Sequence, residues 1–469
     1  MSQENKGNIL GYERLPRLLQ KFAVPSIIAM LVSSLYNIVD QIFIGQGVGY
    51  LGNAATNVAF PLTTICLAFA LLIGIGSASK FSLWLGAGKK EEAARVVANA
   101  IIVMVVVGIC YMVVIELFLQ PLLNAFGSTP EVMPYAISYT RITAVGMPFL
   151  IIVNCMSSLA RADGSPKYSM TCMVIGAVIN TILNPIFIFG LGLGVEGSAL
   201  ATVIGQVVSF FFAISYTRRF KQIKLKREYF KLDLRECFQF LSLGISNSLN
   251  QVALTFVQIV LNNGMTAYGE HSIYGSDIPL AACGIVMKTN AIWLAVIIGI
   301  SQGSQPIVGF NYGAKQYDRV RGTYKLAITC NFIVSIVAFL LFQICPRQIL
   351  SLFGTGDELY FEFAVKFMRT FLLLVIVNGV QLITSNFFSA IGKPLKGLIL
   401  SMTRQVIFLI PLAIILPMFL GLDGILYSGP IADAAAFTVA VFLIMREMKR
   451  MKKMEAQMQA PTESAVSES

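Results

Sequence analysis

The sequence predicts an all-α membrane protein with twelve transmembrane helices in two six-helix lobes related by a parallel pseudo-two-fold repeat. Three observations predict this fold class: the composition, the spacing of apolar runs, and motifs that recur in the second half. Of the 469 residues, 56% are hydrophobic and 13% are charged, and the mean hydropathy is +0.74. A soluble protein has about 25% charged residues, so this chain lacks the ionic surface of a water-soluble protein.

Apolar runs between charged or Gly- and Pro-rich breaks give the twelve candidate helices. A helix needs about 20 residues to cross a hydrocarbon core about 30 Å thick, and the runs meet this length. The connections between them are too short for a catalytic domain, so no enzyme activity is predicted. The predicted spans are 18–44, 56–85, 95–120, 134–160, 168–190, 196–217, 237–266, 281–309, 320–345, 360–389, 396–420 and 424–447.

The Lys and Arg residues gather on one side of this arrangement. Of the 35, 28 lie in the even-numbered connections and at the two ends, including the loop from Arg218 to Arg235. Because cytoplasmic loops retain positive charge, both termini are predicted to be cytoplasmic, in a multi-pass protein of the inner (plasma) membrane. This placement explains the net charge of +11 without a nucleic acid partner. A lipid-headgroup patch on the same loop is compatible with these charges.

The second half of the chain repeats motifs of the first. LLIGIGSASK at 71–80 resembles VIIGISQGSQ at 296–305, and GVEG at 194–197 resembles GLDG at 421–424. Because six is an even number, both halves enter the membrane from the same side, which predicts a symmetry axis along the membrane normal and a central cavity. The predicted domains are an N-terminal lobe (1–217), a cytoplasmic basic linker (218–236), a C-terminal lobe (237–450) and a disordered cytoplasmic tail (451–469).

Asp40 is the outstanding ionisable residue within the spans. A charge at the centre of a bilayer costs at least about 2.5 kcal/mol, so such a residue is a functional candidate. At 1.5 Å per residue, Asp40 lies roughly 28 Å above Lys21, in the outer half of the membrane. A carboxylate ringed by neutral oxygens can exchange a proton or hold a small hard cation such as Na⁺, and a carboxylate that only caps interhelical hydrogen bonds is the alternative. Neutral polar residues on the same helix face or at the same depth complete the candidate ion-coupling site: Tyr36, Asn37, Asn180, Asn184 and Thr202.

Further amides and hydroxyls form polar stripes on several spans. On the seventh span they recur every three or four residues, and Gln258 falls near the position that corresponds to Asp40. Such a stripe can form a cavity wall that contacts substrate or can join helices by amide hydrogen bonds, and both interpretations stay open. The candidate substrate-cavity residues are Gln206, Gln251, Thr255, Gln258, Asn262, Asn378 and Gln381. The eight cysteines fall singly, without metal-ligand spacing, so no other metal site and no cofactor are predicted.

Other charges within the spans are weaker candidates. Arg404 lies near the predicted inner face, where its long side chain can snorkel to water. Asp433 can line the cavity or pair with Lys288. Arg161 and Asp163 flank the turn between the fourth and fifth spans, which we expect to be solvated, with an inner-gate salt bridge as the alternative.

These features together resemble the multidrug and toxic compound extrusion (MATE) family over essentially all twelve spans. The resemblance rests on Pro25 and Asp40 in VPSIIAMLVSSLYNIVDQIFIG, the LGAGKKEEA loop, the RADGSPK loop and the stretch NTILNPIFIFGLGLGVEGSALAT. It implies cation coupling at Asp40 with contributions from Asn180 and Thr202, and bending of the first helix at Pro25. Where many relatives have Asp in the pattern N-x-x-x-D-P, this chain has Asn184, which favours H⁺ over Na⁺ as the coupling ion.

The predicted function is a monomeric secondary antiporter that exports drugs and other, often cationic, small molecules in exchange for H⁺ or Na⁺. A flippase for lipid-linked sugars is the alternative within transport, and it would need a strongly cationic central cavity. A non-transporting membrane scaffold or receptor is the alternative outside transport, and it would not need a buried acid. No phosphate-binding GxxxxGK[ST] motif is present in the sequence.

Overall fold

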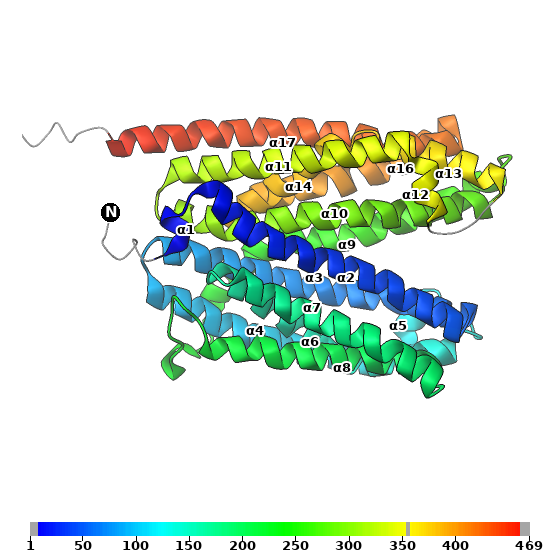
Figure 1. Ribbon diagram of the computed structural model, residues 1–469, viewed down its shortest axis with the longest axis horizontal. Helices are drawn as coiled ribbons and strands as arrows, with labels where there is room; N and C mark the ends of the chain where they lie inside the picture. Colours follow the sequence, from blue (N-terminus) through cyan, green and yellow to red (C-terminus); the bar gives the residue numbers. More distant parts are fainter. Residues whose placement is uncertain (1–7, 353–356, 460–469) are drawn as a thin grey trace, which may run out of the picture.

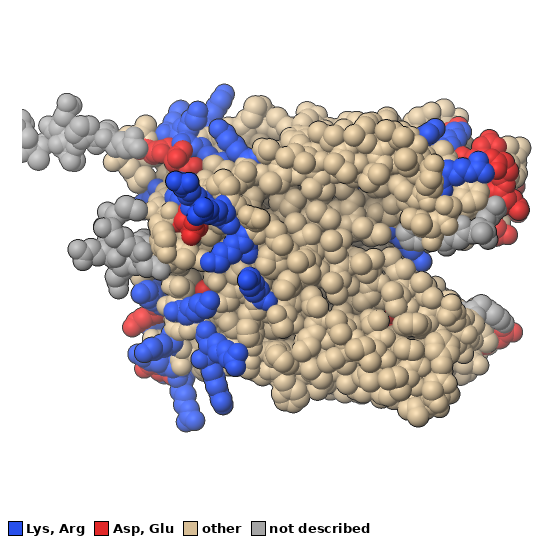
Figure 2. Space-filling view, viewed as in Figure 1, with Lys and Arg blue, Asp and Glu red and all other residues tan. Residues whose placement is uncertain are grey.

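The computed structural model describes residues 8–352 and 357–459, and within these ranges it consists of helices and connections without strands. Figure 1 shows the long helices side by side along the longest axis of the molecule. The first described residues and the end of the last helix, α17, lie at the same end of the molecule. Figure 2 shows that most of the visible Lys and Arg side chains gather at this end, which we call the basic end.

The first half of the chain forms six long helices, each near a predicted span. Two short helices, α1 (Ile9–Tyr12) and α5 (Leu119–Ala125), accompany them. Pro185 ends α7 and supplies no N–H to the helix, and a wider π-helical stretch, Ile186–Gly190, completes the fifth predicted span. The long helices are α2 (Leu15–Gly47), α3 (Tyr50–Gly86), α4 (Lys90–Leu117), α6 (Met133–Ala162), α7 (Pro166–Pro185) and α8 (Gly194–Ser215).

The second half follows the same plan with more interruptions. The eleventh predicted span is divided by a second π-helical stretch, Thr403–Leu409. A short helix, α12 (Pro346–Ser351), follows α11. The other helices are α9 (Leu234–Glu270), α10 (Asp277–Gly313), α11 (Tyr317–Ile344), α13 (Glu358–Phe371), α14 (Val375–Ala390), α15 (Pro394–Met402), α16 (Ile410–Leu420) and α17 (Leu422–Gln459).

Among the described residues, ten helical segments are long and apolar enough to cross a membrane. The pair α13 and α14, bent by 51° at its break, makes an eleventh. The remaining predicted span is the seventh, which corresponds to α9; this helix has 37 residues but is less apolar than the others. Its stripe of amides, with Asn247, Gln251 and Gln258 among them, explains the difference. The chain is thus an all-α multi-pass membrane protein.

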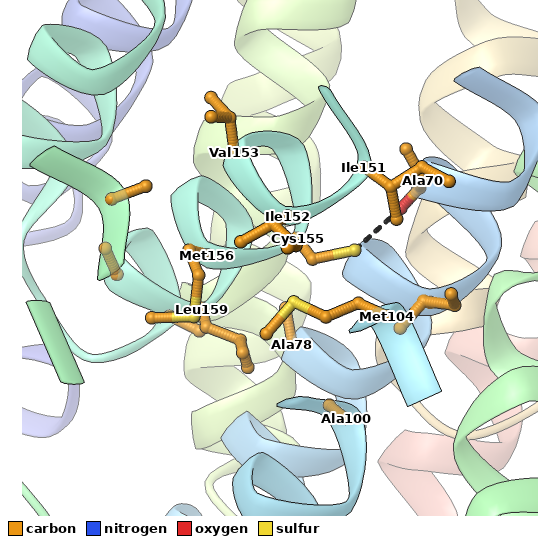
Figure 3. Close-up of a cluster of buried hydrophobic side chains, with 14 of the residues drawn as sticks. Ala70, Ala78, Ala100, Met104, Ile151, Ile152, Val153, Cys155, Met156 and Leu159 are labelled. Carbon is orange, nitrogen blue, oxygen red and sulfur yellow. Dashed lines mark hydrogen bonds between the residues drawn. The ribbon is translucent and has the colours of Figure 1, made fainter. Parts of the chain in front are cut away.

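Buried hydrophobic side chains form two large clusters, one in each half of the chain. The first draws on residues 10–240 together with Ile307 and Phe310, and the second on residues 257–451. Figure 3 shows part of the first, where side chains of α3, α4 and α6 interlock and the Cys155 thiol donates to the Ala70 carbonyl at 3.4 Å. Because lipid tails are as apolar as these side chains, close packing holds such helices together more than exclusion from water does.

The helices of the two halves form two bundles, α2 to α8 in the first and α9 to α17 in the second. The two bundles touch tightly near the basic end. Gly76 of α3 faces the Phe240 carbonyl of α9, and Gly244 of α9 faces the Leu72 carbonyl of α3, so closely that a Cβ at either glycine would overlap the facing backbone. Two glycines of α10 approach the α2 backbone in the same way. At the opposite end the bundles diverge, and Figure 2 shows a hollow between them. The molecule is therefore closed at the basic end and open at the other.

Two predicted boundaries differ from the structure. The predicted disordered tail begins at residue 451, but α17 continues through Gln459, because Met451 is fully buried and Glu455 accepts from Arg321 Nη2 at 2.6 Å. That prediction is wrong for 451–459, and residues 460–469 lie outside the described ranges. The predicted linker ends at 236, whereas α9 begins at Leu234, where the Asp233 side chain caps the helix.

Candidate functional site

Asp40 lies at a junction of three helices. Its carboxylate, on α2, accepts a short hydrogen bond from Asn184 Nδ2 of α7 and a second from Ser198 Oγ of α8 at 3.0 Å. Asn184 and Ser198 are fully buried. Neither donor carries a charge, and among the described residues no Lys, Arg or His pairs with Asp40. The carboxylate is therefore held by neutral donors alone.

A chain of amides extends from Asp40 toward the interior of the first bundle. Asn184 Nδ2 also donates to Asn180 Oδ1 at 3.3 Å, and Asn180 Nδ2 donates to Thr202 Oγ1 at 2.9 Å. The structure thus brings together Asp40, Asn180, Asn184 and Thr202, which the sequence predicted to share one depth. Asn184 Oδ1 is buried and has no hydrogen-bond partner.

A cavity of about 180 Å³ adjoins this chain. Of the predicted residues, Tyr36, Asn37 and Gln206 line it together with Asn180 and Thr202, whereas Asp40 lies one helical turn beyond Tyr36, outside the lining. Asn37 Nδ2 donates to its own helix at the Ser33 carbonyl, 2.7 Å away. The lining is uncharged and part apolar: Ser33, Tyr36, Asn37, Thr63, Leu67, Leu150, Val153, Asn154, Met173, Gly176, Ala177, Asn180, Thr202, Gln206 and Ser209.

Ser198 is a site residue that sequence reasoning missed. It lies four residues before Thr202 on α8, so both side chains face the same side of that helix. The signal was therefore present: the same spacing argument that placed Asn180 and Asn184 together on α7 would also have placed Ser198 beside Thr202.

A second cavity, of about 80 Å³, lies between the two bundles and against the second. Gln251, Asn378 and Gln381 line it, as predicted for a substrate cavity, whereas Thr255, Gln258 and Asn262 do not. Gln258 Nε2 instead donates to Asn262 Oδ1 at 2.8 Å, within α9. The lining is rich in amides: Leu71, Ile75, Asn247, Asn250, Gln251, Leu254, Leu294, Ile298, Gln302, Asn378, Gln381, Leu382, Ser385, Asn386, Ser401, Arg404 and Gln405.

The second bundle buries Arg404 and Asp433, and the structure corrects the sequence-based interpretation of both residues. Arg404 Nε donates to Asp433 Oδ1 at 2.6 Å, and the two side chains are 10% and 2% exposed. Arg404 therefore does not snorkel to the inner face, and the partner of Asp433 is Arg404, not Lys288. The pairing has a physical cause, because an oppositely charged partner offsets part of the cost of burying a charge away from water.

Arg161 and Asp163 are neither solvated nor paired with each other, so both interpretations of this turn were wrong. The buried Arg161 guanidinium donates to Ser26 Oγ at 3.2 Å and to Gln302 Oε1 at 2.8 Å, which links α6 with α10 of the other bundle. Asp163, also buried, accepts from the Tyr216 hydroxyl at 2.7 Å and from the backbone N–H groups of Lys221 and Gln222. Burial raises the pKa of Asp163 to about 6.

Pro25 lies buried within α2, which continues through it. A proline supplies no N–H and clashes with the preceding turn, so this is the weakest point of the α2 hydrogen-bond ladder. Bending at Pro25 stays a prediction. No group of three or more His, Cys, Asp or Glu side chains in the described part of the chain is arranged to hold a metal ion.

Known multidrug export proteins are similar to this chain along nearly its whole length. The multidrug export protein MepA of Staphylococcus haemolyticus is 26% identical over 435 residues, which cover 91% of this chain and 93% of MepA. The probable multidrug resistance protein YoeA of Bacillus subtilis is 26% identical over 438 residues, covering 91% of this chain and 92% of YoeA.

Solved structures share the whole fold. A crystal structure of a MATE protein in the straight conformation has a TM-score of 0.89 at 24% identity, covering 96% of this chain and 99% of the other. An outward-facing conformation of a multidrug resistance MATE family transporter gives the same values. The family model described as MatE matches residues 25–186 and again residues 245–415, one match in each half. The chain therefore belongs to the MatE family.

Proposed function

We propose that this protein exports drugs and other, often cationic, small molecules from the cell in exchange for protons that bind at Asp40. The multidrug export and multidrug resistance proteins that it resembles along nearly their whole length support the export of drugs. The single observation that carries the coupling mechanism is the carboxylate of Asp40, enclosed by three helices and held only by the neutral donors Asn184 and Ser198. Such a charge is left for a mobile cation to neutralise.

Asn184 allows the site to hold Asp40 in both protonation states. When the carboxyl is ionised, the amide donates to it through Nδ2. When the carboxyl is protonated, rotation of the amide by half a turn turns the carbonyl Oδ1, which now has no partner, toward the new O–H. In each state Asn184 then forms a hydrogen bond that matches the protonation of Asp40, so the proton can bind and leave without the loss of this contact.

The same donor set supports H⁺ more than Na⁺. A sodium ion in a protein is held by several oxygens, and a second carboxylate would offset its dehydration. Here the amide of Asn184 takes the place of a second acid beside Asp40, and its N–H₂ group faces the carboxylate. A proton needs only the carboxyl oxygen and one acceptor.

Exchange follows from competition between two positive charges. A cationic compound in the uncharged cavity beside Tyr36 and Asn180 is attracted by ionised Asp40 nearby. Protonation removes that attraction, and the compound can then leave through the open end. If the basic end is cytoplasmic, as positive charge in loops indicates, the structure represents an outward-open state with both termini in the cytoplasm.

The linings of the two cavities argue against the alternative of a flippase for lipid-linked sugars. A pyrophosphate needs a cationic cavity, whereas the only charged residue that lines either of these two cavities is Arg404, and Asp433 neutralises it. We therefore place drug export first.

The test is efflux of a cationic dye by the purified protein in liposomes, with an imposed pH gradient or an imposed sodium gradient. We expect the pH gradient alone to drive efflux and Asp40→Asn to reduce efflux to the level of empty liposomes. Asp318→Asn, an exposed carboxylate at the basic end, serves as the matched control and should retain full activity. Equal efflux by Asp40→Asn and wild type would remove Asp40 from the mechanism, and efflux driven by sodium alone would contradict proton coupling.

A further inference from the structure

A cavity of about 720 Å³ lies at the basic end of the first bundle. Its walls come from the start of α2, the turn between α6 and α7, the start of α7, and the segment that follows α8. The helices α2, α7 and α8 are also the three that hold Asp40, Asn184 and Ser198. A ligand in this cavity would therefore contact α2, α7 and the segment that directly follows α8.

Four cations line this cavity: Lys21, Lys167, Arg219 and Lys221. All four are exposed, and in the described part of the chain no carboxylate forms an ion pair with any of them. The one acid in the lining, Asp163, is fully buried, and the Tyr216 hydroxyl and two backbone N–H groups occupy its oxygens. The cavity thus offers an excess of positive charge to a ligand.

The start of α7 adds backbone donors to the same wall. This 20-residue helix begins at Pro166, and the Ser165 side chain makes no capping bond to it. Lys167 and Tyr168 lie in the first turn, whose N–H groups have no acceptor within the helix. The positive end of a helix favours an anion, and a phosphate is the anion that such sites commonly bind.

An apolar surface adjoins the cavity. The Tyr168 hydroxyl, in the cavity wall, donates to the Phe212 carbonyl at 2.7 Å, and the side chains of Phe211 and Phe212 on α8 are 63% and 41% exposed. Free phosphate has no apolar part that could pack on this surface, whereas the acyl chains of a phospholipid would cover it.

We propose that this cavity binds the phosphate of an anionic phospholipid headgroup, with its acyl chains over the end of α8, and that the lipid braces α2, α7 and α8 against one another. The binding itself does not depend on the proposed export function. An effect of the bound lipid on efflux, by contrast, would depend on that function.

The first experiment measures equilibrium binding of a short-chain phosphatidylglycerol to the full-length protein in neutral detergent, with phosphatidylcholine as the uncharged comparison. Each Lys or Arg near an anionic lipid surface contributes about fivefold to binding. We therefore expect Lys167→Gln/Lys221→Gln to bind phosphatidylglycerol about 25-fold more weakly than wild type. A second pair with no residue in common, Lys21→Gln/Arg219→Gln, should show a similar loss and protects the result if the first variant is poorly folded.

The matched control is Lys224→Gln/Arg227→Gln, which removes two exposed charges from the same connecting segment outside the cavity lining. It should bind like wild type, and an equal loss in this control would overturn the proposal in favour of general surface charge. Binding of phosphatidylcholine as tightly as phosphatidylglycerol would overturn it as well. Displacement of the lipid by inorganic phosphate at equal concentration would show a site for free phosphate and would overturn the assignment to a lipid. Because binding is read directly, failure of drug export would leave this result unaffected.

Discussion

Asp40 in the first bundle and Asp433 in the second are carboxylates within the helices that are stabilised in different ways. Asp40 of the first bundle accepts hydrogen bonds from the neutral donors Asn184 and Ser198. Asp433 of the second forms an ion pair with Arg404. An internal ion pair leaves no net charge for a mobile ion to neutralise, whereas neutral donors leave the full negative charge in place. The comparison therefore supports the proposal that ion exchange takes place in the first bundle, and it favours a structural role for the buried pair in the second.

The largest expected effect lies in the second bundle. Arg404→Met leaves Asp433 buried without its partner, which is expected to lower the free energy of unfolding by about 3–5 kcal/mol. Asp40→Asn should change it by less than about 1 kcal/mol, because Asn keeps an acceptor oxygen for Asn184 and Ser198. Thermal and denaturant unfolding in detergent measure both. The double variant Arg404→Met/Asp433→Leu should recover most of the loss, and equal costs for Arg404→Met and Asp40→Asn would break the comparison.

Asp163 tests whether neutral donors leave a buried carboxyl able to bind a proton. It accepts from a hydroxyl and two backbone N–H groups, and burial raises its pKa from 3.8 to about 6. The folded protein therefore binds this proton at a higher pH than the unfolded chain, so Asp163 makes the folded state more stable as the pH falls from about 7 to about 4. The gain is at most about 3 kcal/mol.

The measurement is unfolding stability against pH for wild type and Asp163→Asn. The variant should lack this part of the pH dependence, while Asp318→Asn, whose side chain is 83% exposed, should keep it. Parallel curves for wild type and Asp163→Asn would show that neutral donors hold such a carboxyl ionised, and would weaken the interpretation of Asp40.

The smallest expected effect comes from one donor of the first bundle. Ser198→Ala removes a hydrogen bond to the Asp40 carboxylate, and a bond to a charged group contributes about 1.5–3 kcal/mol. The ionised form loses this stabilisation, so the pH of half-maximal efflux should move upward by about one unit or more. Ser209→Ala, on the same helix and lining the adjoining cavity without a bond to Asp40, should leave it unchanged. A shift of equal size in both variants would argue against a specific role for Ser198.

Much of the fold and part of the site follow from periodicity and depth. The predicted spans fall on the observed helices, because apolar runs of this length admit few other structures in a membrane. Counting 1.5 Å per residue from the helix ends placed Asp40, Asn180, Asn184 and Thr202 together, and the structure joins them by hydrogen bonds.

Distance along the helices also places the pair in the second bundle away from both faces of the membrane. Arg404 lies ten residues from Pro394, and Asp433 lies eleven residues from Leu422 at the opposite end. Each residue is therefore about 15 Å from one end of its helical segment, which does not by itself identify the two as partners. The assumption that a long side chain snorkels to water turned attention away from Arg404 as the partner of Asp433.

Other features depend on tertiary contacts that no local pattern records. The molecule is closed at the basic end because glycines of α3 and α9 contact backbone carbonyls of the other bundle there. The partners of Arg161 and Asp163 lie on distant segments, up to 141 residues away. Sequence spacing places residues along one helix, but it does not choose between two arrangements of the same helices.

The two π-helical stretches, Ile186–Gly190 and Thr403–Leu409, bear on how the chain can change in length inside the bilayer. The first begins two residues after Asn184, and the second contains Arg404. Such a widened turn accommodates one extra residue, so the loss of one residue there would restore a regular turn and leave the helix beyond it facing nearly the same way. In a regular helix the same loss would rotate everything beyond it by about 100°. A change in length by one residue should therefore be tolerated better at these two stretches than elsewhere inside the bilayer.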